Sequence, residues 1–193
     1  MLRGFVCGIA VLIACLLQPV SGSAQDEAHP KAKARATGHA YFLTGFMGVT
    51  SRLDSVMAKV KQRGVSATMA SPGGYESLAN SAIGAHRRGA PVVIVGYSIG
   101  GGAALNMAAL LDAAKVPVEM VLIVDGSSGP ISPNVRRLVN LYVPGGYGAP
   151  IARPANFRGS IQNVAVRGAN VGHFSVIDAY ERQLVAYVLS AAR

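Results

Sequence analysis

A continuous apolar run that ends in a glycine-rich turn constrains the fold of this chain more than any other feature. Residues 92–95 are all valine or isoleucine, and the turn from Gly96 to Gly100 follows at once. A short apolar run without alternation is typical of a strand buried on both faces of a parallel sheet. The glycines and alanines at 101–104 favour a helix that packs closely on that strand. The chain is therefore expected to pass from a central strand through a tight turn into a helix.

Strand-like and helix-like segments alternate from Ala40 to the end of the chain. Apolar residues spaced i, i+3, i+4 and i+7, such as Leu53, Val56, Met57 and Val60, predict helices. The alternation predicts an α/β fold, a three-layer sandwich whose mostly parallel sheet of about six strands carries helices on both faces. Strands are expected at residues 40–44, 65–69, 92–95, 118–124, 138–143 and 161–166, with helices around 53–63, 78–83, 101–114 and 177–188.

The first 24 residues have the layout of a secretory signal peptide. Met1 to Arg3 give a basic start, residues 4–17 are apolar and uncharged, and small residues precede Gln25. The apolar run is short for a membrane span. Cleavage before Gln25 predicts export to the periplasm or the medium. An uncleaved anchor and a lipoprotein attached at Cys15 are the alternatives.

The rest of the chain suffices for one packed domain. Residues 25–39 contain the basic tract from His29 to Arg35 and are expected to form a flexible linker, which leaves residues 40–193 for the domain. Both cysteines lie in the expected signal peptide. A disulfide, a cysteine nucleophile and a thiolate metal site are therefore not expected in the processed chain.

The formal net charge is +9, yet the basic residues of the domain are scattered. The only pairs are the arginines at 87–88 and 136–137, and they are not interleaved with the aromatic residues that single-strand nucleic-acid binding requires. Nucleic acid is therefore not an expected partner, whereas attraction to anionic envelope surfaces agrees with the charge. The histidines His29, His39 and His86 have no metal-ligand spacing, so neither a metal nor a cofactor is expected.

The turn carries a candidate nucleophile, Ser98. A serine hydroxyl attacks only when a neighbouring base takes its proton, and a sharp strand-to-helix turn projects the side chain toward such a base. Gly96 and Gly100, two residues before and after Ser98, relieve the crowding in a turn of this kind. A phosphate-binding loop would need lysine followed by serine or threonine, which residues 100–103 do not supply, and the glycine spacing does not match the dinucleotide-binding pattern.

Chain order leaves one base and one acid for Ser98. Catalytic side chains in an open α/β sheet lie where strands end, so an acid and then a histidine are expected downstream. His173 is the only histidine after Ser98. Of the intervening carboxylates, Asp125 ends a predicted strand, whereas Asp112 lies within a helix and Glu119 near the start of a strand. Asp125 is the expected partner of the His173 Nδ1 atom, with a turn residue that accepts backbone amides as the alternative.

Negative charge develops on the substrate oxygen when Ser98 attacks, and two backbone N–H groups are expected to stabilise it. One is that of Ile99. The other comes from the loop after the first strand, where Phe46 is the candidate and Met47 the alternative.

Four segments together resemble the α/β-hydrolase superfamily: residues 43–46, 96–100, Asp125 and residues 172–174. The resemblance covers residues 40–193 and implies an α/β-hydrolase-type sandwich with a Ser-His-Asp triad. Asp125 directly follows the predicted strand that comes next after the strand of Ser98. This placement of the acid is similar to the arrangement in thioesterase domains.

Two departures from the superfamily matter. Its usual first two strands are missing, and residues 126–134 are too few for a helical lid, so a minimal lidless member is expected. The segment from Gly145 to Gly159, rich in proline, glycine and aromatic residues, is expected to line the site instead.

The sequence predicts an exported serine hydrolase that cleaves a small-molecule or lipid-like carboxylic ester through an acyl-enzyme. A thioesterase or acyltransferase with the same triad is one alternative, because the acid placement resembles thioesterase domains. A non-catalytic envelope protein that keeps the fold is the other, although all three triad positions are filled.

Overall fold

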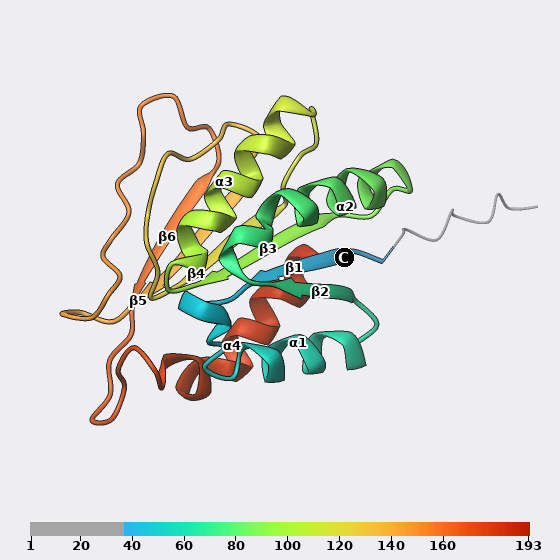
Figure 1. The fold of residues 1–193 in the computed structure, drawn as a ribbon. Helices are drawn as coiled ribbons and strands as arrows, with labels where there is room; N and C mark the ends of the chain where they lie inside the picture. Colours follow the sequence, from blue (N-terminus) through green and yellow to red (C-terminus); the bar gives the residue numbers. More distant parts are fainter. Residues whose placement is uncertain (1–36) are drawn as a thin grey trace, which may run out of the picture. The chain divides into compact units, whose positions relative to one another are not determined.

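The computed structural model describes residues 37–193 (Figure 1). The expected signal peptide and residues 25–36 of the expected linker lie outside this range. The elements are β1 His39–Leu43, η1 Phe46–Gly48, α1 Leu53–Gln62, β2 Ser66–Ala70, η2 Pro72–Gly74, α2 Tyr75–Arg87, β3 Val92–Tyr97, α3 Gly100–Ala113, β4 Met120–Val124, β5 Arg137–Tyr142, β6 Ser160–Ala165 and α4 Val176–Ala191, where η marks a 3-10 helix.

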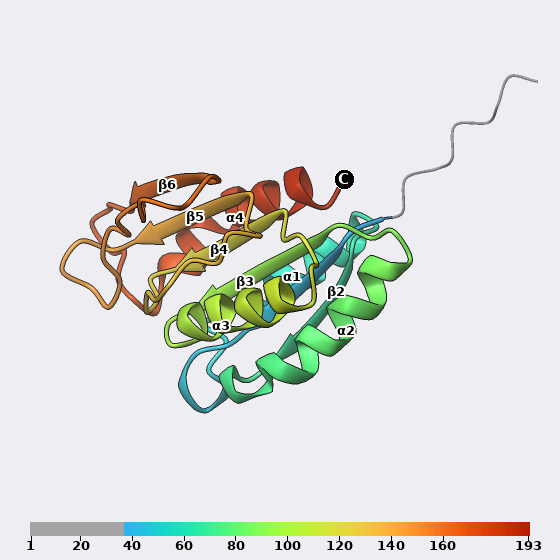
Figure 2. The same ribbon diagram turned by 90° about the horizontal axis from the view of Figure 1, so that it is seen from above.

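The strands form one sheet in the order β2-β1-β3-β4-β5-β6, and all pairs are parallel. Figures 1 and 2 show α1 and α4 on one face and α2 and α3 on the other. Every residue of β3 and β4 is buried, as expected for central strands covered on both faces. The predicted α/β sandwich with a parallel sheet is confirmed.

Each face of the sheet has its own apolar core, because successive strand residues point to opposite sides. In β1, Ala40 and Phe42 belong to the core under α1 and α4, whereas Tyr41 and Leu43 belong to the core under α2 and α3. Within residues 37–193, the buried residues of the two cores extend from Ala40 to Ala192. This part of the chain therefore supplies an apolar core to each face of the sheet.

The strand order reverses between β1 and β3. From β1 the chain passes to β2 on one side, and from β3 it passes to β4 on the other. In open α/β sheets ligands bind beyond the carboxyl ends of the strands at such a switch point. The segments that leave this edge beside the switch point are the loop after β1 and the turn between β3 and α3.

The structure differs from the sequence prediction in small ways. β4 begins at Met120 instead of residue 118, because Val118 forms only an isolated bridge with Val135. β1 includes His39, which the prediction gave to the linker. No helix interrupts residues 126–136, which agrees with the expected lack of a helical lid. Within residues 37–193, none of the helices combines the length and apolarity needed to cross a bilayer.

Candidate active site

Ser98 lies between the end of β3 and the start of α3, in a turn whose backbone is strained. Its φ angle is 56°, in the left-handed region that residues other than glycine rarely adopt. The two flanking glycines permit the turn: a Cβ on Gly96 would lie 2.2 Å from the Gly100 oxygen, and one on Gly100 would lie 2.4 Å from the Leu43 and Thr44 oxygens. The turn therefore packs against the end of β1 at a distance that only glycine allows.

The structure brings Ser98, His173 and Asp125 into one hydrogen-bonded chain. The Nε2 atom of His173 lies 3.1 Å from the Ser98 Oγ atom, and its Nδ1 atom lies 2.7 Å from Asp125 Oδ2. Ser98 follows β3, Asp125 follows β4, and His173 lies in the loop between β6 and α4. An ionised carboxylate accepts hydrogen bonds and donates none. The Nδ1 atom therefore carries the proton, and the Nε2 atom faces Ser98 as an acceptor.

Asp125 is fully buried, with a left-handed φ of 39°. Its Oδ1 atom accepts the Val143 and Gly148 N–H groups, each at 2.9 Å, and its Oδ2 atom accepts the Tyr147 N–H at 3.3 Å. Burial alone would raise the pKa of the carboxyl, but the hydrogen bonds from Val143, His173, Gly148 and Tyr147 outweigh it and hold the pKa below its ordinary value. Asp125 thus accepts backbone amides, as a turn residue does, while it also binds His173.

Tyr97 holds the backbone and the ring of His173. Its hydroxyl donates to the His173 carbonyl oxygen at 3.0 Å and accepts from the Ser51 Oγ at 2.9 Å. The two rings stack with centroids 5.0 Å apart and an interplanar angle of 22°. Burial raises the pKa of Tyr97, so the hydroxyl keeps its proton and remains a donor.

A cleft of about 220 Å³ opens over Ser98. Its walls are mainly apolar, and its lining residues are Gly45, Phe46, Val49, Tyr97, Ser98, His173 and Phe174. The backbone N–H groups of Ile99 and Phe46 donate to no protein acceptor within residues 37–193. Phe46 lines the cleft, whereas Met47 does not.

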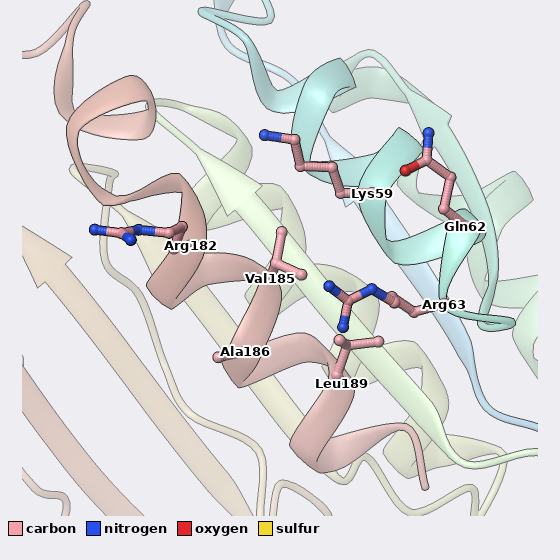
Figure 3. A pocket seen from close by; sticks show the side chains of 7 residues that line it. All are labelled: Lys59, Gln62, Arg63, Arg182, Val185, Ala186 and Leu189. Carbon is pink, nitrogen blue, oxygen red and sulfur yellow. The ribbon is translucent and has the colours of Figure 1, made fainter.

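A larger depression of about 480 Å³ lies between α1 and α4 (Figure 3). Lys59, Arg63 and Arg182 surround an apolar floor that includes Val185 and Leu189. These residues provide neither a hydroxyl nucleophile nor an imidazole base. The smaller cleft at Ser98 is therefore the candidate active site.

Metal-ligating side chains do not gather elsewhere in the described residues. Among residues 37–193, no group of three or more histidine, cysteine, aspartate or glutamate side chains could hold a metal ion. His39 instead bonds to the Thr68 hydroxyl at 2.9 Å and stacks on Tyr41. His29 lies outside the described residues.

Comparison with solved structures identifies the fold. A Xanthomonas campestris pv. campestris protein, assigned to the hydrolases of the α/β superfamily, superposes with a TM-score of 0.54 at 18% identity, over 79% of this chain and 99% of that one. Human thioesterase 2 superposes with a TM-score of 0.57 at 14% identity, over 81% of this chain and 96% of that one. The type II thioesterase of the borrelidin biosynthetic cluster superposes with a TM-score of 0.54 at 13% identity, over 86% of this chain and 95% of that one. This chain has the α/β-hydrolase fold.

These similarities establish the fold alone, because sequence identity to the three proteins is 18% or less. No protein-family model matches the sequence, and no curated protein matches it either. The expectation of an α/β-hydrolase-type sandwich is confirmed. Within this α/β-hydrolase fold, Ser98, Asp125 and His173 lie at the carboxyl edge of the sheet.

Sequence reasoning missed the residues that support the site. The sequence analysis assigns no role to Tyr97, although an aromatic residue beside a candidate nucleophile is an available signal. The segment from Gly145 to Gly159 was expected to line the cleft. None of its residues is among the cleft-lining residues; Tyr147 and Gly148 wrap around Asp125 instead.

Proposed function

We propose that the protein is an exported serine hydrolase that cleaves carboxylic esters through Ser98, His173 and Asp125. The observation that carries the proposal is the continuous hydrogen-bonded chain from the Ser98 Oγ through both imidazole nitrogens to the buried Asp125 carboxylate. A left-handed serine at a strand-to-helix turn, with an imidazole in reach, is the arrangement that activates a hydroxyl.

The first half of the reaction forms an acyl-enzyme. The Ser98 Oγ attacks the ester carbonyl carbon while the Nε2 atom of His173 takes the hydroxyl proton. Asp125 accepts a hydrogen bond from the His173 Nδ1–H group and stabilises the imidazolium. The Ile99 and Phe46 N–H groups bind the oxyanion. The intermediate then collapses, the carbon–oxygen bond to the alcohol breaks, and His173 gives its proton to the departing alcohol.

The second half of the reaction releases the carboxylic acid product from Ser98. A water molecule gives a proton to the His173 Nε2 and attacks the acyl carbon, and the Ser98 Oγ leaves with the proton that His173 returns. The N–H groups of Ile99 and Phe46 serve both halves, because the oxyanion occupies the same position in each. No cofactor enters either step.

A thioester substrate, or transfer of the acyl group to an acceptor other than water, is the second candidate. Asp125 follows β4, which is the next strand in the chain after β3, the strand that precedes Ser98. This placement of the acid resembles that in thioesterase domains. Two of the similar structures are also described as thioesterases. The signal-peptide layout of residues 1–24 favours esters, because acyl thioesters on carriers are intracellular substrates.

Labelling with a serine-directed fluorophosphonate tests the proposal. Peptide mapping should find the label on Ser98, and Ser98→Ala should abolish it, while Ser190→Ala, an exposed serine on α4, should label as the wild type does. An ester and a thioester with the same acyl group should then be compared by kcat/KM. An unlabelled wild-type protein that cleaves neither compound would point to a non-catalytic role.

A further inference from the structure

Large apolar side chains that face solvent are concentrated around the cleft. Within residues 37–193, the substantially exposed ones are Phe46, Met47, Val49, Leu110, Tyr147 and Phe174. Phe46, Val49 and Phe174 line the cleft over Ser98. Met47 adjoins Phe46 in the chain, and the ring of Tyr147 lies 5.4 Å from that of His173. Only Leu110, on α3, lies apart from this set.

We call Phe46, Met47, Val49, Tyr147 and Phe174 the apolar collar. Its members come from three connections at the carboxyl edge of the sheet: the loop after β1, the β5–β6 connection and the β6–α4 loop. Segments distant in the sequence thus bring apolar side chains to one opening. Concentrated exposed apolar surface marks a place where a partner or a membrane binds, whereas single exposed residues need no explanation.

The collar projects into solvent at Met47. Met47 is 86% exposed as a residue, and Phe174 is 75% exposed. Met47 and the following Gly48 both have left-handed backbones, with φ angles of 51° and 83°, and a Cβ on Gly48 would meet no atom within 4 Å. Met47 thus combines a left-handed backbone with a flexible apolar side chain that is largely exposed to solvent.

The charge around the collar disfavours a basic partner and agrees with an anionic lipid surface. Residues 44–52 and 166–175, which carry four of the five collar members, contain no aspartate or glutamate and include Arg52 and Arg167. Arg52 pairs with Asp178, while Arg167 is exposed and forms no ion pair within residues 37–193. The net charge of the chain is +9. Apolar side chains beside basic ones are the combination that binds anionic bilayers.

We propose that the apolar collar docks the protein on an anionic phospholipid surface, with Met47 and Phe174 inserted among the lipids and the cleft open toward them. An apolar cleft that opens within the collar would take a lipid-like ester directly from that surface. The docking itself does not depend on catalysis, whereas this role in delivering substrate rests on the proposed ester hydrolysis.

Vesicle sedimentation tests the docking separately from catalysis. The protein used is the chain from Gln25, which retains both cores and lacks the apolar amino-terminal run, with Ser98→Ala so that no lipid is cleaved. Vesicles of phosphatidylcholine with phosphatidylglycerol should bind it more tightly than vesicles of phosphatidylcholine alone. Met47→Gln should lower the affinity about tenfold, because a buried methionine side chain contributes at least that factor. Phe174→Gln should do the same.

Leu110→Gln is the matched control, because Leu110 is the large exposed apolar residue within residues 37–193 that lies outside the collar. Its vesicle affinity should stay within about twofold of the parent, since Leu110 does not touch the lipid. Urea unfolding of each variant verifies that the domain remains folded.

Three results would overturn the docking proposal. One is the absence of vesicle binding by the parent chain, and another is equal binding by the parent, Met47→Gln and Phe174→Gln. The third is a self-associated parent in sedimentation velocity that Met47→Gln dissociates without any change in vesicle binding, which would make the collar a protein interface. Hydrolysis of a water-soluble ester by the active chain in any of these cases would leave the proposed function intact.

Discussion

Removing the Tyr97 hydroxyl should lower turnover by disturbing His173, without touching the reacting groups. Tyr97→Phe deletes the bond to the His173 carbonyl oxygen and the bond from the Ser51 hydroxyl, and it keeps the ring that stacks on the imidazole. Two hydrogen bonds at about 0.5–1.5 kcal/mol each correspond to a loss of about 1–3 kcal/mol in the free energy of unfolding. A shift of His173 relative to Ser98 should reduce kcat by about tenfold, with a smaller change in KM.

Tyr41→Phe is a matched control for this prediction. Tyr41 is also fully buried, but its hydroxyl has no hydrogen-bond partner within the described residues, so its removal should be neutral or stabilising. Urea unfolding gives the two stabilities, and initial rates with a water-soluble ester give kcat and KM. The reasoning would be wrong if Tyr97→Phe retained the kcat of Tyr41→Phe, because the hydroxyl would then contribute only to packing.

Other predictions concern the turn, the acid and the amino terminus. Gly100→Ala should lower the free energy of unfolding by about 1–3 kcal/mol, because the new Cβ overlaps the end of β1. Gly73→Ala is the control, since its Cβ meets nothing within 4 Å. Urea titration should show that it changes the free energy of unfolding by less than about 1 kcal/mol. The low pKa of Asp125 stabilises the folded state fully above the ordinary aspartate value of about 3.9, and this contribution is lost as the pH falls toward the lower pKa of the folded state. Acid unfolding of Asp125→Asn should therefore lack that part of the pH dependence, and an unchanged curve would contradict the assignment. Amino-terminal sequencing of the protein from its own cells should begin at Gln25 or Asp26, and an intact Met1 in a soluble cytoplasmic fraction would contradict export.

Most of the fold was predictable because two simple patterns recur along the sequence. Fully apolar runs predicted the buried strands, and the spacing of Leu53, Val56 and Val60 predicted α1. These three are the buried residues of that helix. The boundary of β4 was less predictable, since Val118 is as apolar as the strand residues that follow it. Its backbone pairs only in an isolated bridge, and pairing depends on the neighbouring chain instead of on local composition.

The proximity of Ser98, Asp125 and His173 was predictable by elimination, because few suitable side chains follow the turn. Their supporting contacts were not. Tyr97 bonds to Ser51 and His173, which are 46 and 76 residues away, and no local pattern encodes such a meeting. The contact of Gly148 was not predictable either, because this residue is one of several glycines in the segment from Gly145 to Gly159. In the structure its backbone N–H approaches Asp125 so closely that a Cβ would lie 2.9 Å from Oδ1.

Turnover of triad variants on a water-soluble ester tests the central claim most directly. Ser98→Ala, His173→Ala and Asp125→Asn should each remain folded and lower kcat by several orders of magnitude, and the triple variant should be little worse than Ser98→Ala, because the three groups act as a unit. Additive losses would contradict that unit. Near-wild-type kcat in a folded Asp125→Asn protein would leave Ser98 and His173 as a dyad, and retained hydrolysis by folded Ser98→Ala would contradict the account as a whole.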